Sequence, residues 1–179
     1  MGKKVTVITS SLRNGSNSDI LAQAFADGAR DAGNEVNVIS LKNKNIRFCI
    51  GCLACQASGK CVMQDDVAEI MAEVKESDVL AFASPVYYYS ISGQLKTLLD
   101  RLNPLFADEY RFCDIYFLSV AHEDETTTVE GAETAIQGWV DCFSEARLVK
   151  TFFAGGVGAP REIKDHKALQ QAYETGKSI

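Results

Sequence analysis

Four cysteines lie close together in the first third of the chain, with the spacing C-x2-C-x2-C-x5-C. They are Cys49, Cys52, Cys55 and Cys61. Thiolates at this spacing can ligate a cubane iron–sulfur cluster or zinc, although zinc sites usually have two separated cysteine pairs. A redox-active thiol pair in C-x-x-C is a further interpretation. The four residues can also simply shape a tight loop, and the sequence leaves these alternatives open.

A polar loop from Ser10 to Ser18 follows the first apolar run of the chain. Seven of its nine side chains can donate hydrogen bonds, and a predicted helix begins at its end. Helix N-termini attract anions, and Arg13 can bind phosphate through its planar guanidinium. The glycine pattern of a dinucleotide site and the Gly-Lys-Ser/Thr ending of a nucleoside-triphosphate loop are both absent. The loop therefore predicts a phosphomonoester site, with a capped polar turn as the alternative.

Three consecutive tyrosines, Tyr87, Tyr88 and Tyr89, lie in the segment Ser84–Ser92, just after another apolar run. Tyrosine offers a flat apolar face and a hydroxyl, which suits a site for a planar ring. Gly93 follows and permits a close approach of backbone to a ligand. The alternative is an aromatic patch that covers a sheet edge or a subunit interface.

Short β-rich runs alternate with helical patterns along the whole chain. Strands are predicted at 5–9, 36–39, 79–83, 115–120 and 148–154, and helices at 20–28, 67–74, 95–102, 132–143 and 168–173. This alternation predicts one α/β domain over residues 1–179, doubly wound, with a five-stranded parallel sheet and helices on both faces. Ligands of such sheets bind beyond the carboxyl ends of the strands. We therefore expect the loops at 10–18, 84–92 and 121–128 to line a site.

Several short motifs lie in these loops and helices. They are S-L-R at 11–13, S-N-S at 16–18, G-K-C-V at 59–62, D-D at 65–66, S-P-V-Y at 84–87, G-Q-L-K at 93–96, D-R at 100–101, A-Y at 172–173 and G-K at 176–177. Together they resemble the motifs of the flavodoxin-like NAD(P)H-dependent FMN reductases, over essentially the whole chain. Ser10 stands where that family's pattern has glycine. The cysteine spacing is similar to that of the iron–sulfur flavoproteins, a branch of the family.

The resemblance implies a flavodoxin-like sandwich that binds FMN. It implies hydride transfer from NAD(P)H to the flavin and onward reduction of a quinone, a nitro or azo compound, a flavin or a protein. The alternative is a flavodoxin-like or iron–sulfur flavoprotein electron carrier with no small-molecule turnover of its own. The implied FMN-binding residues are Ser11, Arg13, Ser16, Asn17 and Ser18 at the phosphate, Pro85, Val86, Tyr87, Tyr88 and Ser90 beside the ring, and Ser119, Ala121 and His122 on its other side. If a 4Fe–4S cluster is present, the cysteines named above are its ligands.

No side-chain acid or base is required when the cofactor carries the chemistry, so no catalytic residue is assigned. His122, which follows the fourth predicted strand, is the best candidate for a proton donor, and a solvated loop residue is the alternative. The other two cysteines, Cys113 and Cys142, are predicted to be buried small residues, and Trp139 is predicted to belong to the core.

Composition narrows the class of protein further. The chain has 179 residues, is 46% hydrophobic and has a net charge of −6, which excludes a disordered chain and argues against nucleic-acid or membrane partners. Without a long apolar run or a signal peptide, a cytoplasmic protein is expected, in a compartment that keeps thiols reduced. The resemblance also implies a homodimer or homotetramer.

Overall fold

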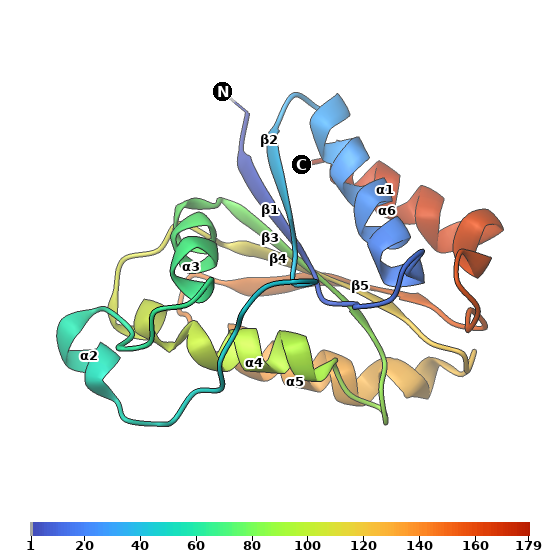
Figure 1. The fold of residues 1–179 in the computed structure, drawn as a ribbon. Helices are drawn as coiled ribbons and strands as arrows, with labels where there is room; N and C mark the ends of the chain where they lie inside the picture. Colours follow the sequence, from blue (N-terminus) through green and yellow to red (C-terminus); the bar gives the residue numbers. More distant parts are fainter. Residues whose placement is uncertain (1) are drawn as a thin grey trace.

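A parallel sheet of five strands forms the centre of the molecule (Figure 1). The computed structural model describes residues 2–179. The strands are β1 (Lys4–Thr9), β2 (Glu35–Ser40), β3 (Val79–Pro85), β4 (Asp114–Val120) and β5 (Arg147–Ala154). Their order across the sheet is β2-β1-β3-β4-β5, and each neighbouring pair is parallel. The predicted five-stranded parallel sheet is therefore confirmed.

Helices connect the strands and cover both faces of the sheet. They are α1 (Asn17–Asp31), α2 (Ala54–Ser58), α3 (Val67–Glu76), α4 (Gly93–Arg101), α5 (Glu130–Val140) and α6 (Lys167–Lys177), with short 3-10 helices η1 (Asn103–Ala107), η2 (Thr126–Val129) and η3 (Glu162–Asp165). Helices α1 and α6 lie on one face, and α3, α4 and α5 lie on the other (Figure 1). Within residues 2–179 no helix has the length and apolar character needed to cross a bilayer.

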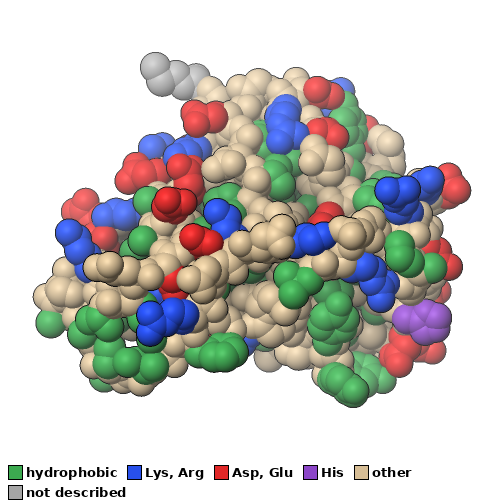
Figure 2. Space-filling view, in the orientation of Figure 1, with side chains coloured by type: hydrophobic (Ala, Val, Ile, Leu, Met, Phe, Trp, Pro, Cys, Tyr) green, Lys and Arg blue, Asp and Glu red, His purple; other side chains and the backbone are tan. Residues whose placement is uncertain are grey.

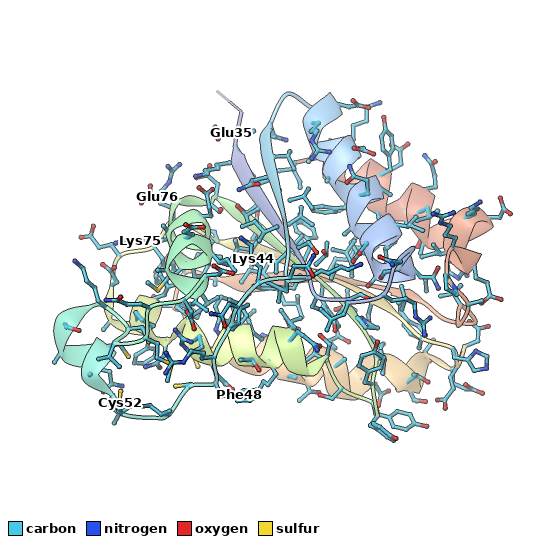
Figure 3. All side chains as sticks on the ribbon, viewed as in Figure 1. Glu35, Lys44, Phe48, Cys52, Lys75 and Glu76 are labelled. Carbon is cyan, nitrogen blue, oxygen red and sulfur yellow. The ribbon has the colours of Figure 1, made fainter. Side chains whose placement is uncertain are left out.

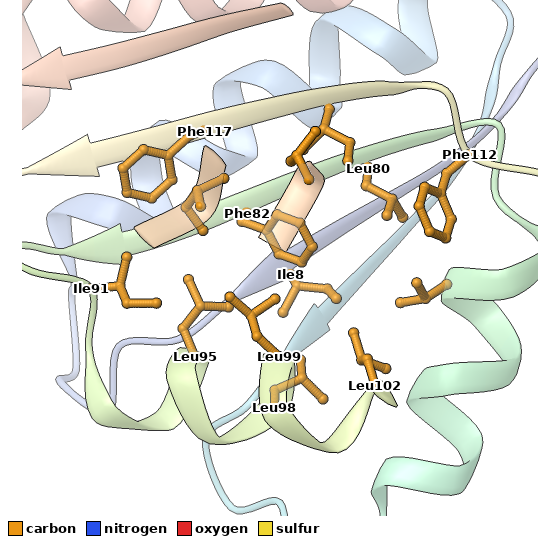
Figure 4. Close-up of a cluster of buried hydrophobic side chains, with 14 of the residues drawn as sticks. Ile8, Leu80, Phe82, Ile91, Leu95, Leu98, Leu99, Leu102, Phe112 and Phe117 are labelled. Carbon is orange, nitrogen blue, oxygen red and sulfur yellow. The ribbon is translucent and has the colours of Figure 1, made fainter. Parts of the chain in front are cut away.

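Each face of the sheet has its own apolar core, because alternate residues of a strand point to opposite faces. On β1, Val5 and Val7 join the core under α1 and α6, whereas Ile8 joins the core on the α4 side. Helix α4 and its C-cap direct four leucines at helical spacing toward this second core (Figure 4). These are Leu95, Leu98, Leu99 and Leu102. The two cores fix where the strands end and thus where the connecting loops meet.

Two glycines bring α1 and α6 into close contact. A Cβ on Gly28 would lie 2.0 Å from the carbonyl oxygen of Tyr173, and a Cβ on Gly176 would lie 2.1 Å from the carbonyl oxygen of Phe25. These distances leave no room for any side chain, so glycine is required at both positions. Helix α6 is thereby held against α1, and the N-terminus of α1 directly follows the first polar loop.

The structure differs from the sequence prediction at α2 and at two cysteines. The sequence predicts no helix at Ala54–Ser58, where the structure forms a short one between two left-handed residues, Leu53 (φ 56°) and Gly59 (φ 66°). The prediction that Cys113 and Cys142 are buried is wrong, since both are exposed. One lies just before β4 begins and the other just after α5 ends, so neither reaches the core.

Candidate active site

A pocket of about 240 Å³ lies at the carboxyl ends of β1, β3, β4 and β5. The three loops predicted to meet there do meet, and the loop after β5 joins them. The pocket is lined by Ser11, Arg13, Ser16, Asn17, Pro85, Val86, Tyr87, Val120, Ala121, His122, Val157 and Gly158. Four predicted site residues lie outside this lining: Ser18, Tyr88, Ser90 and Ser119.

The N-terminus of α1 forms the polar end of the pocket. Ser16 is the N-cap residue, and its hydroxyl accepts a hydrogen bond of 3.3 Å from the amide of Asp19. The first intrahelical bond runs from the Ile20 amide to the Ser16 carbonyl, so the amides of Asn17 and Ser18 precede it. Such leading amides, together with the helix dipole, attract an anion. This end of the pocket is therefore suited to a phosphate.

Arg13 and Asn17 line the pocket but are held by the loop after β5. A guanidinium nitrogen of Arg13, Nη1, donates to the carbonyl of Gly158 at 2.6 Å. The side-chain amide of Asn17 donates to the carbonyls of Val157 (3.2 Å) and Ala159 (2.8 Å), and its oxygen accepts from the Ile163 amide. In this structure the Asn17 side chain joins α1 to that loop, a different role from the predicted phosphate contact.

Buried hydroxyls lie beneath the pocket and join the strand ends. The Ser18 hydroxyl is 2.9 Å from that of Ser16, so it supports the N-cap from behind. Ser10 donates to the carbonyl of Ala83 in β3 and accepts from Ser92, the N-cap of α4, at 2.8 Å. A glycine at position 10 would lack the hydroxyl that links β1, β3 and α4. This network gives a physical reason for serine at a position where the family pattern has glycine.

Ser119 and Ser84 extend the same layer of hydroxyls. Ser119 is fully buried on β4 and donates to the carbonyl of Ser84 at 3.3 Å. The Ser84 hydroxyl in turn accepts from the Ser92 amide at 2.9 Å. Ser119 therefore fixes the end of β3, from which the tyrosine loop departs.

The tyrosine loop forms a tight turn over residues 87–90. The amide and carbonyl of Tyr87 both bond to Ser90, and Tyr88 and Tyr89 have φ of 49° and 60°. Two successive left-handed residues define a type I′ turn, which non-glycine residues adopt only with strain. The Tyr89 hydroxyl donates to Glu123 at 3.1 Å, a contact that raises the pKa of Tyr89. The turn holds Tyr87 in the pocket wall and leaves Tyr88 fully exposed.

His122 lies at the opposite wall, against the loop after β5. A Cβ on Gly158 would lie 2.4 Å from Nδ1 of His122, so the ring packs directly on the glycine backbone. Glu162 accepts hydrogen bonds of 2.7 Å from the amides of Gly158 and Ala159, and these bonds hold the pKa of Glu162 below its usual range. An anionic Glu162 thus fixes the loop that carries Gly158.

The contribution of this loop was not predicted, although the sequence contains a signal for it. Gly155-Gly156-Val157-Gly158 directly follows the fifth predicted strand. A glycine-rich segment at the carboxyl end of a parallel strand is typical of a ligand-binding loop.

One carboxyl group, that of Asp19, lies behind the phosphate-sized end. Burial raises the pKa of Asp19, and hydrogen bonds with Thr9 and Ser16 offset part of that effect.

A second pocket, of about 480 Å³, lies beside the cysteine loop, which we define as residues 48–62. All four motif cysteines line it, and so does Cys142. Further lining residues include Leu99, Arg101, Asn103, Phe106, Trp139 and Phe143. The predicted core residue Trp139 packs edge-on against Phe82 of the core, and it also lines this pocket. Figure 3 shows Phe48 and Cys52 on this loop, which extends away from the sheet.

The sulfurs of the cysteine loop receive N–H donors. The side-chain amide of Asn103 donates to the Cys55 sulfur at 3.0 Å, and the Gly51 amide donates to the Cys49 sulfur at 3.5 Å. Cys55 is buried and Cys61 is half-buried, whereas Cys49 and Cys52 are exposed. Over residues 2–179 no three potential ligands are already grouped as a metal site. Cluster binding therefore requires the exposed part of the loop to close.

The base of the cysteine loop is closed by carboxylates and one arginine. Asp65 accepts from the Arg47 amide (3.0 Å) and from Arg101 through both oxygens (2.6 and 2.9 Å). Asp66 accepts from the Asn45 amide at 2.7 Å. The side chains of Arg101 and Asp65 are almost entirely inaccessible to solvent. These contacts join the two ends of the loop through groups other than the thiols.

Both implied cofactors fit the residues that are present. The first pocket has a helix N-terminus and serine hydroxyls for a phosphate, and the apolar and aromatic side chains of Pro85, Val86 and Tyr87 for a planar ring. The second is lined by four cysteines, of which Cys55 and Cys61 are at least half-buried, with N–H donors to two sulfurs and a buried guanidinium in the same lining. Four thiolates with hydrogen-bonded sulfurs are the donor set of a 4Fe–4S cluster.

The strand order and the polar loops at the strand ends define a flavodoxin-like α/β protein. A solved structure, the NAD(P)H:quinone oxidoreductase from Methanothermobacter marburgensis, has the same fold, with a TM-score of 0.76 and 19% identity over 99% of this chain and 97% of that one. Residues 3–128 match the family described as NADPH-dependent FMN reductase, and the chain belongs to that family.

Two sequence relatives are iron-sulfur flavoproteins. One, from Archaeoglobus fulgidus, is 38% identical over 99% of this chain and 78% of its own length. Another, from Methanocaldococcus jannaschii, is 41% identical over 57% of this chain and 53% of its own length. The match to the second relative thus spans about half of that protein.

Proposed function

We propose that this protein is an FMN-dependent NAD(P)H oxidoreductase that also holds a 4Fe–4S cluster. When bound, FMN supplies hydride acceptance from a nicotinamide and electron delivery to an acceptor. When bound, a cluster supplies uptake and release of single electrons. The observation that carries the proposal is the presence in one chain of a phosphate-suited pocket and a four-thiol pocket. The iron-sulfur flavoprotein relatives support the second part.

At the first pocket, we assign the FMN phosphate to the hydroxyls of Ser11 and Ser16 and the leading amides of α1. Arg13 adds positive charge while the Gly158 carbonyl holds it in place. Pro85, Val86 and Tyr87 would border the ring on one side, and His122 on the other. The exposed imidazole of His122 is the side chain we assign to proton transfer with a reduced acceptor. We propose a quinone, a nitro or azo compound, a flavin or a protein as that acceptor.

At the second pocket, Cys49, Cys52, Cys55 and Cys61 would hold the cluster. Cys55 and Cys61 are already on the pocket side of the loop, so they would change position least. Gly51, at φ 64°, permits the bend that carries the other two thiols inward.

An electron carrier without small-molecule turnover is the second candidate. The observation that favours it is the exposed acidic run Glu123, Asp124 and Glu125 beside the first pocket. Such a run can guide docking of a basic protein partner.

An anaerobic absorption spectrum, recorded before and after NADPH and then NADH, tests the proposal. We expect two flavin bands that bleach with a nicotinamide, together with a broad shoulder and stoichiometric iron and sulfide. Flavin that stays oxidised with both nicotinamides supports the carrier. Absence of flavin after addition of FMN contradicts both candidates.

Matched serine variants test the ligand set. Cys55→Ser should lose iron and the broad shoulder while it retains FMN. Cys142→Ser removes a thiol from the same pocket that lies outside the motif, so its iron content should equal that of the parent. Equal iron in both variants would rule out the proposed ligands.

A further inference from the structure

Arg101 has one N–H group without a partner in a fully buried position. Its Nη1 donates to the Arg47 carbonyl at 2.7 Å and to Asp65 at 2.6 Å, and its Nη2 donates to Asp65 at 2.9 Å. The third nitrogen, Nε, is buried and has no hydrogen-bond partner among residues 2–179. A buried donor without a hydrogen bond destabilises a fold and is rare, so we expect an acceptor for this N–H group.

Cys61 offers a sulfur acceptor in the pocket that Arg101 also lines. The Asp65 carboxylate is the main cause that raises the pKa of Arg101, and Cys61 acts in the same direction.

Asn103, two residues further on, supplies a second donor to the cysteine loop. Its side-chain amide donates to the Cys55 sulfur at 3.0 Å. Asn103 lies on η1, directly after α4, and α2 packs against η1. The end of α4 and the start of η1 therefore place one donor on the Cys55 sulfur and one unpaired donor in the pocket that Cys61 lines.

We propose that Arg101 and Asn103 are positioning residues that hydrogen-bond the cluster-ligating sulfurs of Cys61 and Cys55 and thereby raise the cluster's reduction potential. The inference rests on the proposed function, since it requires a cluster at these cysteines. N–H donors to sulfur stabilise the more negative, reduced state. Because Asp65 balances the charge of Arg101, the direction of the Arg101 Nε–H should affect the reduction potential more than the net charge does.

Two variants test the inference. Each is loaded anaerobically with iron and sulfide before measurement. Asn103→Leu keeps the branched side-chain shape and removes the donor, while Arg101→Lys keeps the charge and removes the planar Nε–H. The readouts are iron per chain and the midpoint potential of the cluster from a spectroscopic redox titration. Gln56→Ala is the control, because it removes an exposed amide next to Cys55.

We expect each variant to retain FMN and to have a lower cluster potential than the parent. One hydrogen bond should change the reduction equilibrium about 2- to 10-fold, or ~20–60 mV for one electron. Gln56→Ala should keep the parent potential. Loss of iron from a variant whose circular dichroism is unchanged also supports a positioning role.

Unchanged potentials and iron contents in both variants would overturn the inference and leave the proposed function intact. If Arg101→Lys does not fold, Asn103→Leu decides the matter alone. Absence of iron from the loaded parent protein would instead refute the cluster, and the inference with it.

Discussion

Ser16 and Ser18 are two residues apart, but their hydroxyls have different structural roles. Ser16 caps α1 and lines the candidate FMN pocket, while Ser18 contacts Ser16 from below. Ser16→Ala should lower FMN affinity about 10-fold or more, since it removes a donor to a charged group. Ser16→Ala should also lower the free energy of unfolding by about 1 kcal/mol, because α1 loses its N-cap hydroxyl. Titration of FMN fluorescence and urea unfolding measure the two effects.

Ser18→Ala is the matched control for this change. Its FMN affinity should stay within about threefold of the parent, because the hydroxyl does not line the pocket. Equal losses of affinity in the two variants would contradict the distinct roles given to them.

Asp65 makes the stability of the cysteine loop dependent on pH. Burial alone would raise the pKa of Asp65, but hydrogen bonds from Arg101, Arg47 and Val67 outweigh it and hold the pKa below its usual range. A carboxyl with a lowered folded pKa stabilises the fold above about pH 3.9, the unfolded value, and loses that contribution as pH falls through the folded pKa.

Asp65→Asn tests this dependence. The variant leaves Arg101 buried without its counter-charge, so it should lose about 3–5 kcal/mol at pH 7. Its stability should also fall less steeply than that of the parent as the pH is lowered below about 4. Asp100→Asn, in an exposed pair with Lys96, should have little effect on either quantity. Unfolding in urea at several pH values distinguishes these outcomes.

At the scale of elements, the contact between α1 and α6 depends on glycine. Gly28→Ala should cost about 2–3 kcal/mol, because its Cβ would meet the Tyr173 carbonyl and the helices must separate. Gly138→Ala, on an exposed position of α5 with nothing within 4 Å, should instead gain about 0.5–1 kcal/mol. Thermal unfolding of both variants measures this, and a stabilised Gly28→Ala would refute the close contact.

Elements with several apolar residues in a regular pattern could be predicted from the sequence. Very short elements, and features that depend on contacts distant in the chain, could not. The leucines of α4 repeat at helical spacing and β3 is apolar from Val79 to Ala83, so both were evident. Helix α2 has five residues and no apolar period, so nothing local distinguishes it from a loop. Exposure of Cys142 depends on where α5 ends, and small changes in that position decide whether a side chain reaches the core.

The candidate site shows the same division between local and distant causes. Loops after predicted strands could be placed at one sheet edge, because parallel strands have a common carboxyl edge. The role of the Asn17 side chain could not be found, since its partners lie 140 or more residues away along the chain. The Tyr88 side chain could not be excluded from the site either, because its outward direction follows from the left-handed turn.

Two apolar surfaces of the whole molecule are open to solvent. One is the tyrosine turn, with Tyr88 100% exposed, and the other is the cysteine loop, with Phe48 77% and Ile50 69% exposed. Figure 2 shows hydrophobic side chains gathered over the region of α2. Patches of this kind commonly mark contact with another protein.

We therefore expect the purified protein to be a homodimer or homotetramer. Light scattering after size exclusion should give a mass of two or four chains, and Tyr88→Glu should shift it toward one chain. Glu35→Lys, a charge change at an exposed position at the start of β2 and outside both patches, should leave the mass unchanged. A monomeric parent protein would contradict this expectation.

The closure at the base of the cysteine loop bears on how the protein matures in a cell. Asp65, Asp66 and Arg101 tie the loop ends together with groups that no metal replaces. If the proposed cluster binds there, the polypeptide can therefore complete its fold before iron is delivered. Under iron shortage, the chain would persist as a folded precursor, and restored iron supply would activate it without new protein synthesis.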